Sequence, residues 1–374
     1  MKNIPLTKPF FSKEKRIKIS HALNEILQSG NLMMGNWTNK FETNFSKFID
    51  VKHALTTNTC TSALQITLQY FNVLKREVLV PSGSFLTNIS SIKWSGGKPI
   101  FVDMNPDTLS FDLEDLKKKL TKKTKGIVWV HLTGLISKEY EKIISFAKKN
   151  NLFLIEDCAH AHGAEIDGVK AGALGSAGCF SFFPSKVLTT GTGGMITTNL
   201  KSLSDYTKQA RLLGRSLNKK GEISIEGNDW FMDEIRACIG YYQLKDINKI
   251  LAKTRKIANL YNKAFENFNG VQIISNKLEN SGYYLYSLIL DKNIDRDIIV
   301  QNLKSKYNIS TKRIYLPTHQ EKIFKNLEFN ANTLRNTEKT LNQSICLPIY
   351  YELSFKDVDY VIKSVKYEIA HHSG

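Results

Sequence analysis

The stretch Asn151-Leu-Phe-Leu-Ile-Glu-Asp157 ends a run of apolar residues on an acidic pair, and Lys186 follows in Phe180-Ser-Phe-Phe-Pro-Ser-Lys186. A short apolar run of this kind is typical of a buried strand, so Asp157 is expected at the strand's carboxyl end. An enzyme that binds pyridoxal phosphate needs a carboxylate for the ring nitrogen and an amine for the aldehyde. Asp157 and Lys186 are candidates for these roles, with a helix cap and a surface lysine as the ordinary alternatives.

Strand-like and helix-like stretches alternate on both sides of this segment. Apolar runs cover 100–103, 126–130, 153–155, 178–182 and 195–198, and charged helical segments such as 113–120 and 140–149 lie between them. This alternation predicts an α/β fold with a mainly parallel sheet covered by helices and a ligand at the strand ends.

The pattern changes near residue 241. A long polar helix is expected over 244–268, followed by strand-like runs at 271–274 and 283–290 and by further helices. We therefore predict a large cofactor-binding domain over residues 1–245 and a smaller α+β domain over residues 246–374.

Two more segments join a strand-like stretch to a helical one. In Asn58-Thr-Cys-Thr-Ser-Ala-Leu64, Thr61 and Ser62 are expected at a helix N-terminus, where free N–H groups and hydroxyls can bind a phosphate. In Val80-Pro-Ser-Gly-Ser-Phe-Leu-Thr-Asn88, Phe85 can cover a flat ring. An ordinary N-cap and a core phenylalanine are the alternatives.

The ordered series of these motifs resembles the DegT/DnrJ/StrS family of pyridoxal-phosphate sugar aminotransferases, which has the aspartate-aminotransferase fold, fold type I. The resemblance extends through 35–42, 58–64, 99–103, 156–164, 181–194 and 347–351. It implies a large domain with a mainly parallel sheet of the seven-stranded type, a small α+β domain, and a homodimer whose active sites are shared between the chains.

The resemblance also assigns roles to individual residues. Lys186 resembles the Schiff-base lysine, Asp157 resembles the carboxylate that keeps the ring nitrogen protonated, and His160 matches a position near the ring hydroxyl. These three are the implied catalytic residues. The implied phosphate ligands are Thr61, Ser62 and Ser181, and the implied ring-stacking residue is Phe85. Some relatives with His in place of this lysine are sugar 3-dehydratases, so Lys186 favours transamination.

The chain departs from the family pattern in Gly227-Asn-Asp-Trp-Phe-Met232. Asp229 replaces an Asn that typically reaches the cofactor phosphate across the dimer interface, and Phe231 replaces an Arg. A phosphate would repel Asp229, so we expect Asn228 to act as the phosphate ligand if the loop is shifted by one residue. His319, in Tyr315-Leu-Pro-Thr-His319, is a candidate substrate contact or an ordinary loop residue.

These expectations define an enzyme that converts a nucleotide-linked keto-deoxysugar to an amino sugar for polysaccharide or lipopolysaccharide biosynthesis. L-Glutamate is the expected amino donor, and pyridoxamine phosphate would carry the nitrogen between the two half-reactions. The alternatives are an aminotransferase for a non-nucleotide keto sugar or cyclitol, and a non-catalytic relative that binds a ligand.

Composition limits the partners, the metals and the cellular location that are expected for this enzyme. The net charge is +17, but the basic residues form only short groups such as 117–119, 122–123 and 219–220, so no nucleic-acid partner is expected. The five cysteines form no CxxC pair or ligand cluster, so no metal is expected. Without a signal-peptide core or a run of about 18 apolar residues, a cytoplasmic enzyme with no membrane partner is predicted.

Overall fold

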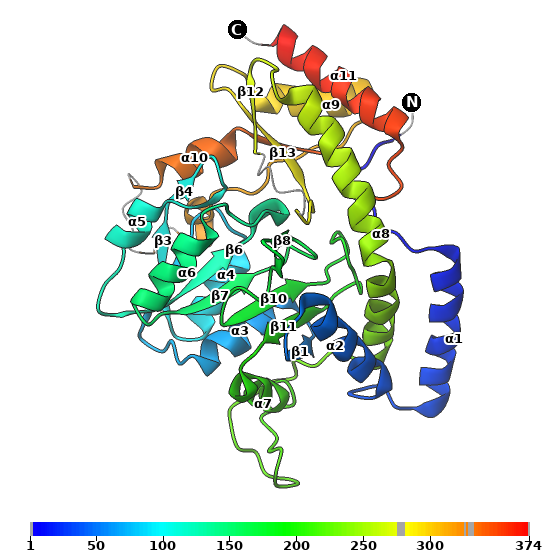
Figure 1. Cartoon of the computed structure of the whole chain (residues 1–374), viewed down its shortest axis with the longest axis vertical. Coiled ribbons are helices and arrows are strands. Elements are labelled where there is room, and N and C mark those ends of the chain that lie inside the picture. Colours follow the sequence, from blue (N-terminus) through cyan, green and yellow to red (C-terminus); the bar gives the residue numbers. More distant parts are fainter. Residues whose placement is uncertain (1–2, 275–280, 325–326, 328–332, 373–374) are drawn as a thin grey trace.

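The computed structural model describes residues 3–274, 281–324, 327 and 333–372. Its centre is a seven-stranded sheet (Figure 1). In chain order the strands are β1 (His53–Thr57), β2 (Glu77–Pro81), β3 (Lys98–Val102), β6 (Thr124–Val130), β7 (Phe153–Asp157), β10 (Ala177–Ser181) and β11 (Gly194–Thr198). The spatial order is β1-β11-β10-β7-β6-β2-β3. β11 runs opposite to the other six strands, so the prediction of a mainly parallel sheet is confirmed.

Helices cover both faces of this sheet because its strands are apolar on both faces. One core contains Val128 and Ile155 and packs under α3 (Cys60–Tyr70), α4 (Leu86–Trp94) and α7 (Lys201–Ala210). The neighbouring strand residues Trp129 and Leu154 belong to a second core. This core packs under α2 (Asn36–Ile49), α5 (Leu113–Lys118) and α6 (Tyr140–Lys149).

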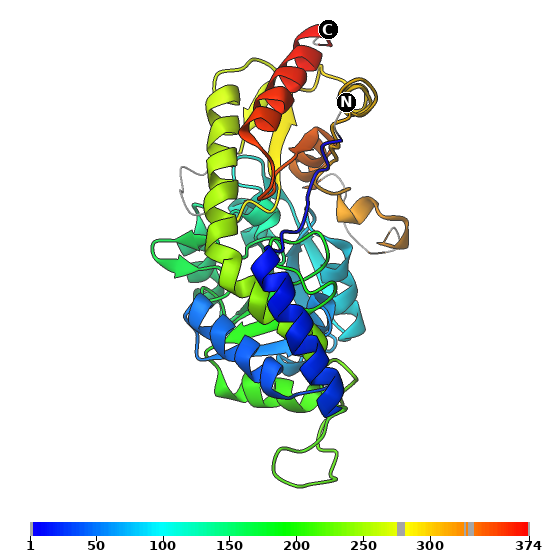
Figure 2. The same cartoon turned by 90° about the vertical axis from the view of Figure 1, so that its right-hand side faces the viewer.

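The remainder of the chain forms a smaller α+β part, as predicted. Its sheet contains β12 (Val271–Ile273), β13 (Tyr286–Leu290) and β14 (Ser344–Leu347), with the helices α9 (Arg296–Tyr307), α10 (Arg335–Asn342) and α11 (Phe355–His371). The 32-residue helix α8 (Glu234–Phe265) joins the two parts along one side of the molecule, and α1 (Lys13–Ser29) packs against it (Figures 1 and 2).

Short elements complete the fold. Two small hairpins are formed by β4 (Met104–Asn105) with β5 (Ser110–Phe111) and by β8 (Glu165–Ile166) with β9 (Val169–Lys170). Among the described residues, 3-10 turns cover Leu132–Gly134, Thr318–Gln320 and Lys322–Phe324. Within the described residues, no helix is both long enough and apolar enough to cross a membrane.

Several predicted boundaries differ from the observed ones. The helix predicted over 140–149 has those bounds, whereas the long helix predicted from residue 244 begins at Glu234. Asp233 caps it there by accepting a hydrogen bond from the Arg236 N–H (2.8 Å). The predicted domain boundary at 245/246 therefore falls inside α8.

Candidate active site

A cavity of about 420 Å³ lies at the carboxyl ends of the central strands. Six of the predicted site residues line it, and they come from four different segments of the large part: Thr61, Phe85, Asp157, His160, Ser181 and Lys186. Tyr284, Lys312 and Tyr315 close it from the smaller part. Ser62, Asn228 and His319 do not line this cavity.

Asp157 is held in one orientation at the end of β7. The side-chain amide of Asn88 donates to Oδ2 (2.7 Å), and the Ala159 N–H donates to Oδ1 (3.0 Å). Asp157 is 5% exposed and faces the cavity, whereas Glu156 points to the other face of the sheet because strand residues alternate. The carboxylate is therefore positioned before any ligand binds.

Lys186 lies in the loop after β10 and is 8% exposed. Its Nζ lies 4.1 Å from the centroid of the Tyr284 ring, and it forms no ion pair with any described carboxylate. Burial lowers the pKa of Lys186 to about 8, an effect that the charge of Asp157 opposes and that of Lys312 reinforces. About one tenth of this amine is therefore neutral and nucleophilic at pH 7, far more than for a lysine with the ordinary pKa.

The N-terminus of α3 supplies hydrogen-bond donors to the same cavity. Thr59 caps the helix by accepting from the Ser62 N–H (3.0 Å), and the N–H groups of Cys60 and Thr61 have no acceptor among the described residues. The Ser62 hydroxyl bonds to Asn58 and Thr59 and is thus directed away from the cavity. Thr61 and Ser181 remain as the predicted hydroxyl donors that line it.

Gly194 allows β11 to approach this helix start closely. A Cβ at Gly194 would lie 2.4 Å from the carbonyl carbon and oxygen of Thr59. Any larger residue would therefore displace the turn that leads into α3.

His160 lies in the turn that follows β7. Its Nδ1 accepts from the Thr133 N–H (3.2 Å), and its Nε2 lies 2.7 Å from the Tyr315 hydroxyl. Burial lowers the pKa of His160 well below its ordinary value, so the ring is neutral and its proton is on Nε2. His160 then donates to Tyr315, which leaves the Tyr315 O–H free to donate to another group.

Aromatic rings form one wall of the cavity. His160 lies 4.3 Å from Tyr284 and 5.6 Å from Tyr315, measured between ring centroids. Phe85, which is 43% exposed, lies 5.3 Å from Tyr315 in a tilted arrangement. A flat ring can bind against these surfaces.

The two other predicted contacts lie elsewhere. Asn228 is exposed in the segment between α7 and α8, and its side-chain oxygen accepts from the Asp229 N–H (2.7 Å). His319 is buried between the hydroxyl of Ser82 (2.5 Å) and a carboxylate oxygen of Glu338 (2.8 Å). The structure thus places His319 in a contact between loops, outside the cavity.

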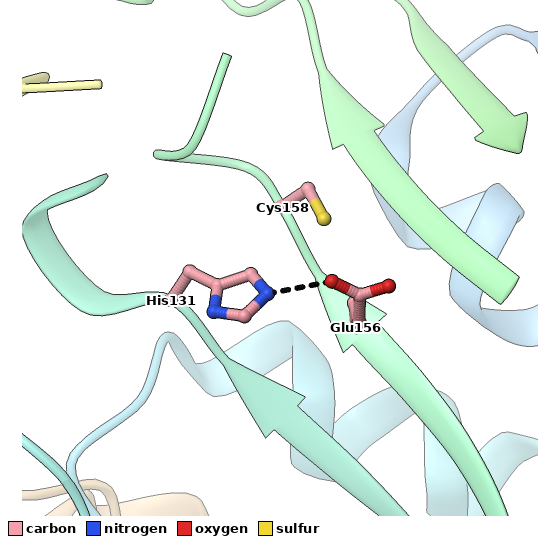
Figure 3. Close-up of side chains that lie close together, drawn as sticks. All are labelled: His131, Glu156 and Cys158. Carbon is pink, nitrogen blue, oxygen red and sulfur yellow. Dashed lines mark hydrogen bonds and ion pairs between the residues drawn. The ribbon is translucent and has the colours of Figure 1, made fainter. Parts of the chain in front are cut away.

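A buried group of possible metal ligands lies close to the site: His131, Glu156 and Cys158 (Figure 3). Glu156 already accepts hydrogen bonds from His131 Nε2 (2.8 Å) and from three backbone N–H groups, those of Gly172, Leu174 and Gly175. Burial raises the pKa of Cys158 well above its ordinary value, which keeps the thiol protonated and a poor ligand. This arrangement fixes the loop over 172–175 against β7.

The residues around the cavity fit pyridoxal 5′-phosphate. They provide a fixed carboxylate (Asp157), a buried amine with a lowered pKa (Lys186), an aromatic wall, and a helix N-terminus whose free N–H groups can bind a phosphate. Three residues at the site were not predicted: Asn88, Tyr284 and Tyr315. They lie in segments singled out from the sequence, namely 80–88, 283–290 and 315–319.

Comparisons with known proteins agree with this arrangement. The model of the DegT/DnrJ/EryC1/StrS aminotransferase family matches residues 13–366. A GDP-perosamine synthase of Escherichia coli O157:H7 is 30% identical over 366 residues, covering 98% of this chain and 98% of the relative. A dTDP-3-amino-3,6-dideoxy-alpha-D-galactopyranose transaminase of Aneurinibacillus thermoaerophilus is 30% identical over 351 residues, covering 93% and 94%.

Solved structures give the same result. PseC of Helicobacter pylori, an aminotransferase involved in the biosynthesis of pseudoaminic acid, has a TM-score of 0.92 at 27% identity, covering 99% of this chain and 100% of that chain. Spr1654 of Streptococcus pneumoniae in its PLP form has a TM-score of 0.91 at 25% identity, covering 99% of each chain. The expected fold class is confirmed.

Proposed function

Because this chain belongs to the DegT/DnrJ/EryC1/StrS family of sugar aminotransferases, it is a transaminase that uses pyridoxal 5′-phosphate, and we propose that its acceptor is a nucleotide-linked keto-deoxysugar. The proposed amino donor is L-glutamate. The observation that carries the proposal is the convergence of Asp157 and Lys186 on one cavity. The names of two relatives, which specify GDP and dTDP sugars, support the choice of acceptor.

The cofactor, when bound, supplies an aldehyde for the donor's amine and a ring that withdraws electrons from the donor's α carbon. Asp157 would favour a proton on the ring nitrogen through its negative charge. Asn88 and the Ala159 N–H orient that carboxylate. The free N–H groups at the start of α3, with Thr61 and Ser181, would bind the phosphate.

Lys186 would serve as the general base. With its pKa lowered to about 8, its Nζ can accept the proton that leaves the donor's α carbon and return a proton later in the cycle. Neutral His160 positions Tyr315, whose free O–H would donate a hydrogen bond to the ring hydroxyl oxygen or to the sugar. The aromatic wall limits the access of water to this proton transfer.

The assay of this proposal measures 2-oxoglutarate formed from glutamate and an aminated sugar formed from a nucleotide-linked keto-deoxysugar. We expect both products from the wild type, and at least a thousandfold loss of turnover in Lys186→Arg, which keeps the charge but cannot act as the neutral amine. Lys149→Arg, at the exposed end of α6, is the matched control. Turnover of Lys186→Arg at the wild-type rate would refute the assignment.

Two alternatives are separated by the same assay. Amination of a free keto sugar or cyclitol in preference to the nucleotide-linked compound would replace the proposed acceptor. Ligand binding without any transamination would identify a non-catalytic relative.

We further propose a homodimer with shared active sites. The segment between α7 and α8 projects from the large part (Figures 1 and 2) and exposes Leu217, Ile223 and Asn228. Asn228 would contact the cofactor phosphate of the partner subunit. Light scattering should give twice the chain mass, and Asn228→Ala should weaken cofactor binding about tenfold, as expected for loss of a hydrogen bond to a charged group. A monomer, or unchanged cofactor affinity, would contradict this.

A further inference from the structure

The cavity contains a second cation, Lys312, that has no role in the reaction as described so far. The backbone of Lys312 is fixed, because the Cys346 N–H of β14 donates to its carbonyl oxygen (2.7 Å). Its Nζ lies 5.9 Å from the centroid of the Tyr315 ring. The smaller part of the molecule therefore places an amine at the cavity wall.

Lys312 lacks a counter-ion in the part of the chain that the structure describes. Its side chain is half-buried and pairs with no described carboxylate. Asp157, the acid that lines the cavity, is already held by Asn88 and the Ala159 N–H. A partly buried cation without a carboxylate partner attracts an anionic ligand.

The charge of Lys312 acts on the reacting end of the cavity. It lowers the pKa values of both Lys186 and His160, in addition to the larger effect of burial. Lys186 and Lys312 line the same cavity, so an anion bound to Lys312 would lie in the cavity that also contains the amine of Lys186. Three anions of the proposed reaction have to be considered: the cofactor phosphate, the phosphates of the sugar nucleotide, and the carboxylates of the donor.

We propose that Lys312 binds the α-carboxylate of the amino-acid donor, an inference that rests on the proposed function. The donor's nitrogen must react where Lys186 reaches, and its α-carboxylate is separated from that nitrogen by one carbon, a distance of about 3 Å. The proposed site for the cofactor phosphate is the start of α3, on the large part. The phosphates of a sugar nucleotide are separated from the keto carbon by part of the sugar ring.

The proposal predicts which substrates depend on Lys312. Every amino-acid donor carries an α-carboxylate, so the effect of losing Lys312 extends to glutamate and alanine alike. The aminated sugar, which enters the reverse half-reaction without such a carboxylate, is independent of it.

The test compares Lys312→Met, Lys312→Arg and the exposed control Lys149→Met in the separate half-reactions. We expect Lys312→Met to raise the KM for glutamate and for alanine by about ten- to a hundredfold, as for loss of a hydrogen bond to a charged group. The KM for the aminated sugar and the amount of bound cofactor should stay within twofold of wild type. Lys312→Arg should recover most of the donor affinity.

A binding measurement makes the test independent of turnover. Calorimetric titration with 2-oxoglutarate should show the same weakening in Lys312→Met and none in Lys149→Met. An unchanged Kd, an effect on glutamate but not alanine, or loss of bound cofactor would each overturn the assignment. If the wild type transferred nitrogen from no amino acid yet lost 2-oxoglutarate binding through Lys312→Met, the proposed function would fail while the carboxylate site stood.

Discussion

At the scale of single residues, the proposed chemistry depends on how far burial lowers the pKa of Lys186. Its pKa falls from 10.5 to about 8, so the protonated form is the one that the folded chain disfavours. Between pH 8 and 10.5 the unfolded chain binds more protons at this residue than the folded chain. The resulting penalty on stability is therefore full below about pH 8 and disappears as the pH rises toward 10.5.

This shift gives a prediction for cofactor uptake. Only the neutral amine attacks the aldehyde, so the rate at which apo-protein binds pyridoxal phosphate covalently should rise about tenfold per pH unit below 8 and level off above it. Stopped-flow absorbance measures this rate. Asp157→Asn removes a charge that raises the pKa of Lys186, so its midpoint should lie at lower pH. A midpoint near 10 in the wild type would contradict the effect of burial.

The sequence predicted the cavity-lining residues that belong to ordered motifs and missed those that come from distant parts of the chain. Asp157 and Lys186 were predicted because a strand end and a family motif mark them. Tyr315, which hydrogen-bonds His160, is separated from it by 155 positions, and no local pattern indicates that contact. Ser62 was predicted to bind phosphate, but hydrogen bonds to Asn58 and Thr59 direct its hydroxyl elsewhere.

At the scale of elements, periodicity found the central strands and α6, but it gives no signal where distant residues define a helix end. The start of α2 has no side-chain cap of its own. Instead Glu234, in the first turn of α8, accepts from the N–H groups of Gly35 (2.9 Å), Trp37 (2.7 Å) and Thr38 (2.8 Å). Nothing near residue 35 in the sequence signals this partner.

This capping contact is testable because Glu234 is 2% exposed. Glu234→Ala leaves three N–H groups without this acceptor, one of them buried and two partly buried, and removes a favourable charge at the start of α2, so we expect a loss of about 2 to 4 kcal/mol in the free energy of unfolding. Urea unfolding measures it. Glu222→Ala, whose carboxylate pairs with Lys219 on the surface, should leave the midpoint unchanged. Equal midpoints for both variants would remove Glu234 from this role.

At the scale of the whole molecule, α8 connects the parts that the sequence divides at 245/246. The core on one face of the central sheet contains side chains from both sides of that point in α8. They are Leu244, which precedes it, and Ile247 and Leu251, which follow it. Farther along, Tyr261 and Phe265 pack into the core that also contains the smaller sheet. The domain boundary at 245/246 therefore stays a prediction, and one continuous helix contributes side chains to both cores.

We expect the two parts to unfold together as a result. All four tryptophans, at positions 37, 94, 129 and 230, precede α8, so their fluorescence reports on the large part. Hydrogen exchange of peptides from β13 and β14 reports on the smaller one. Both signals should change at the same urea concentration, because losing either core exposes half of α8. A fragment ending at residue 245 should aggregate, since it lacks Ile247 and Leu251. Two separated transitions, or a folded fragment, would show that the cores are stable independently.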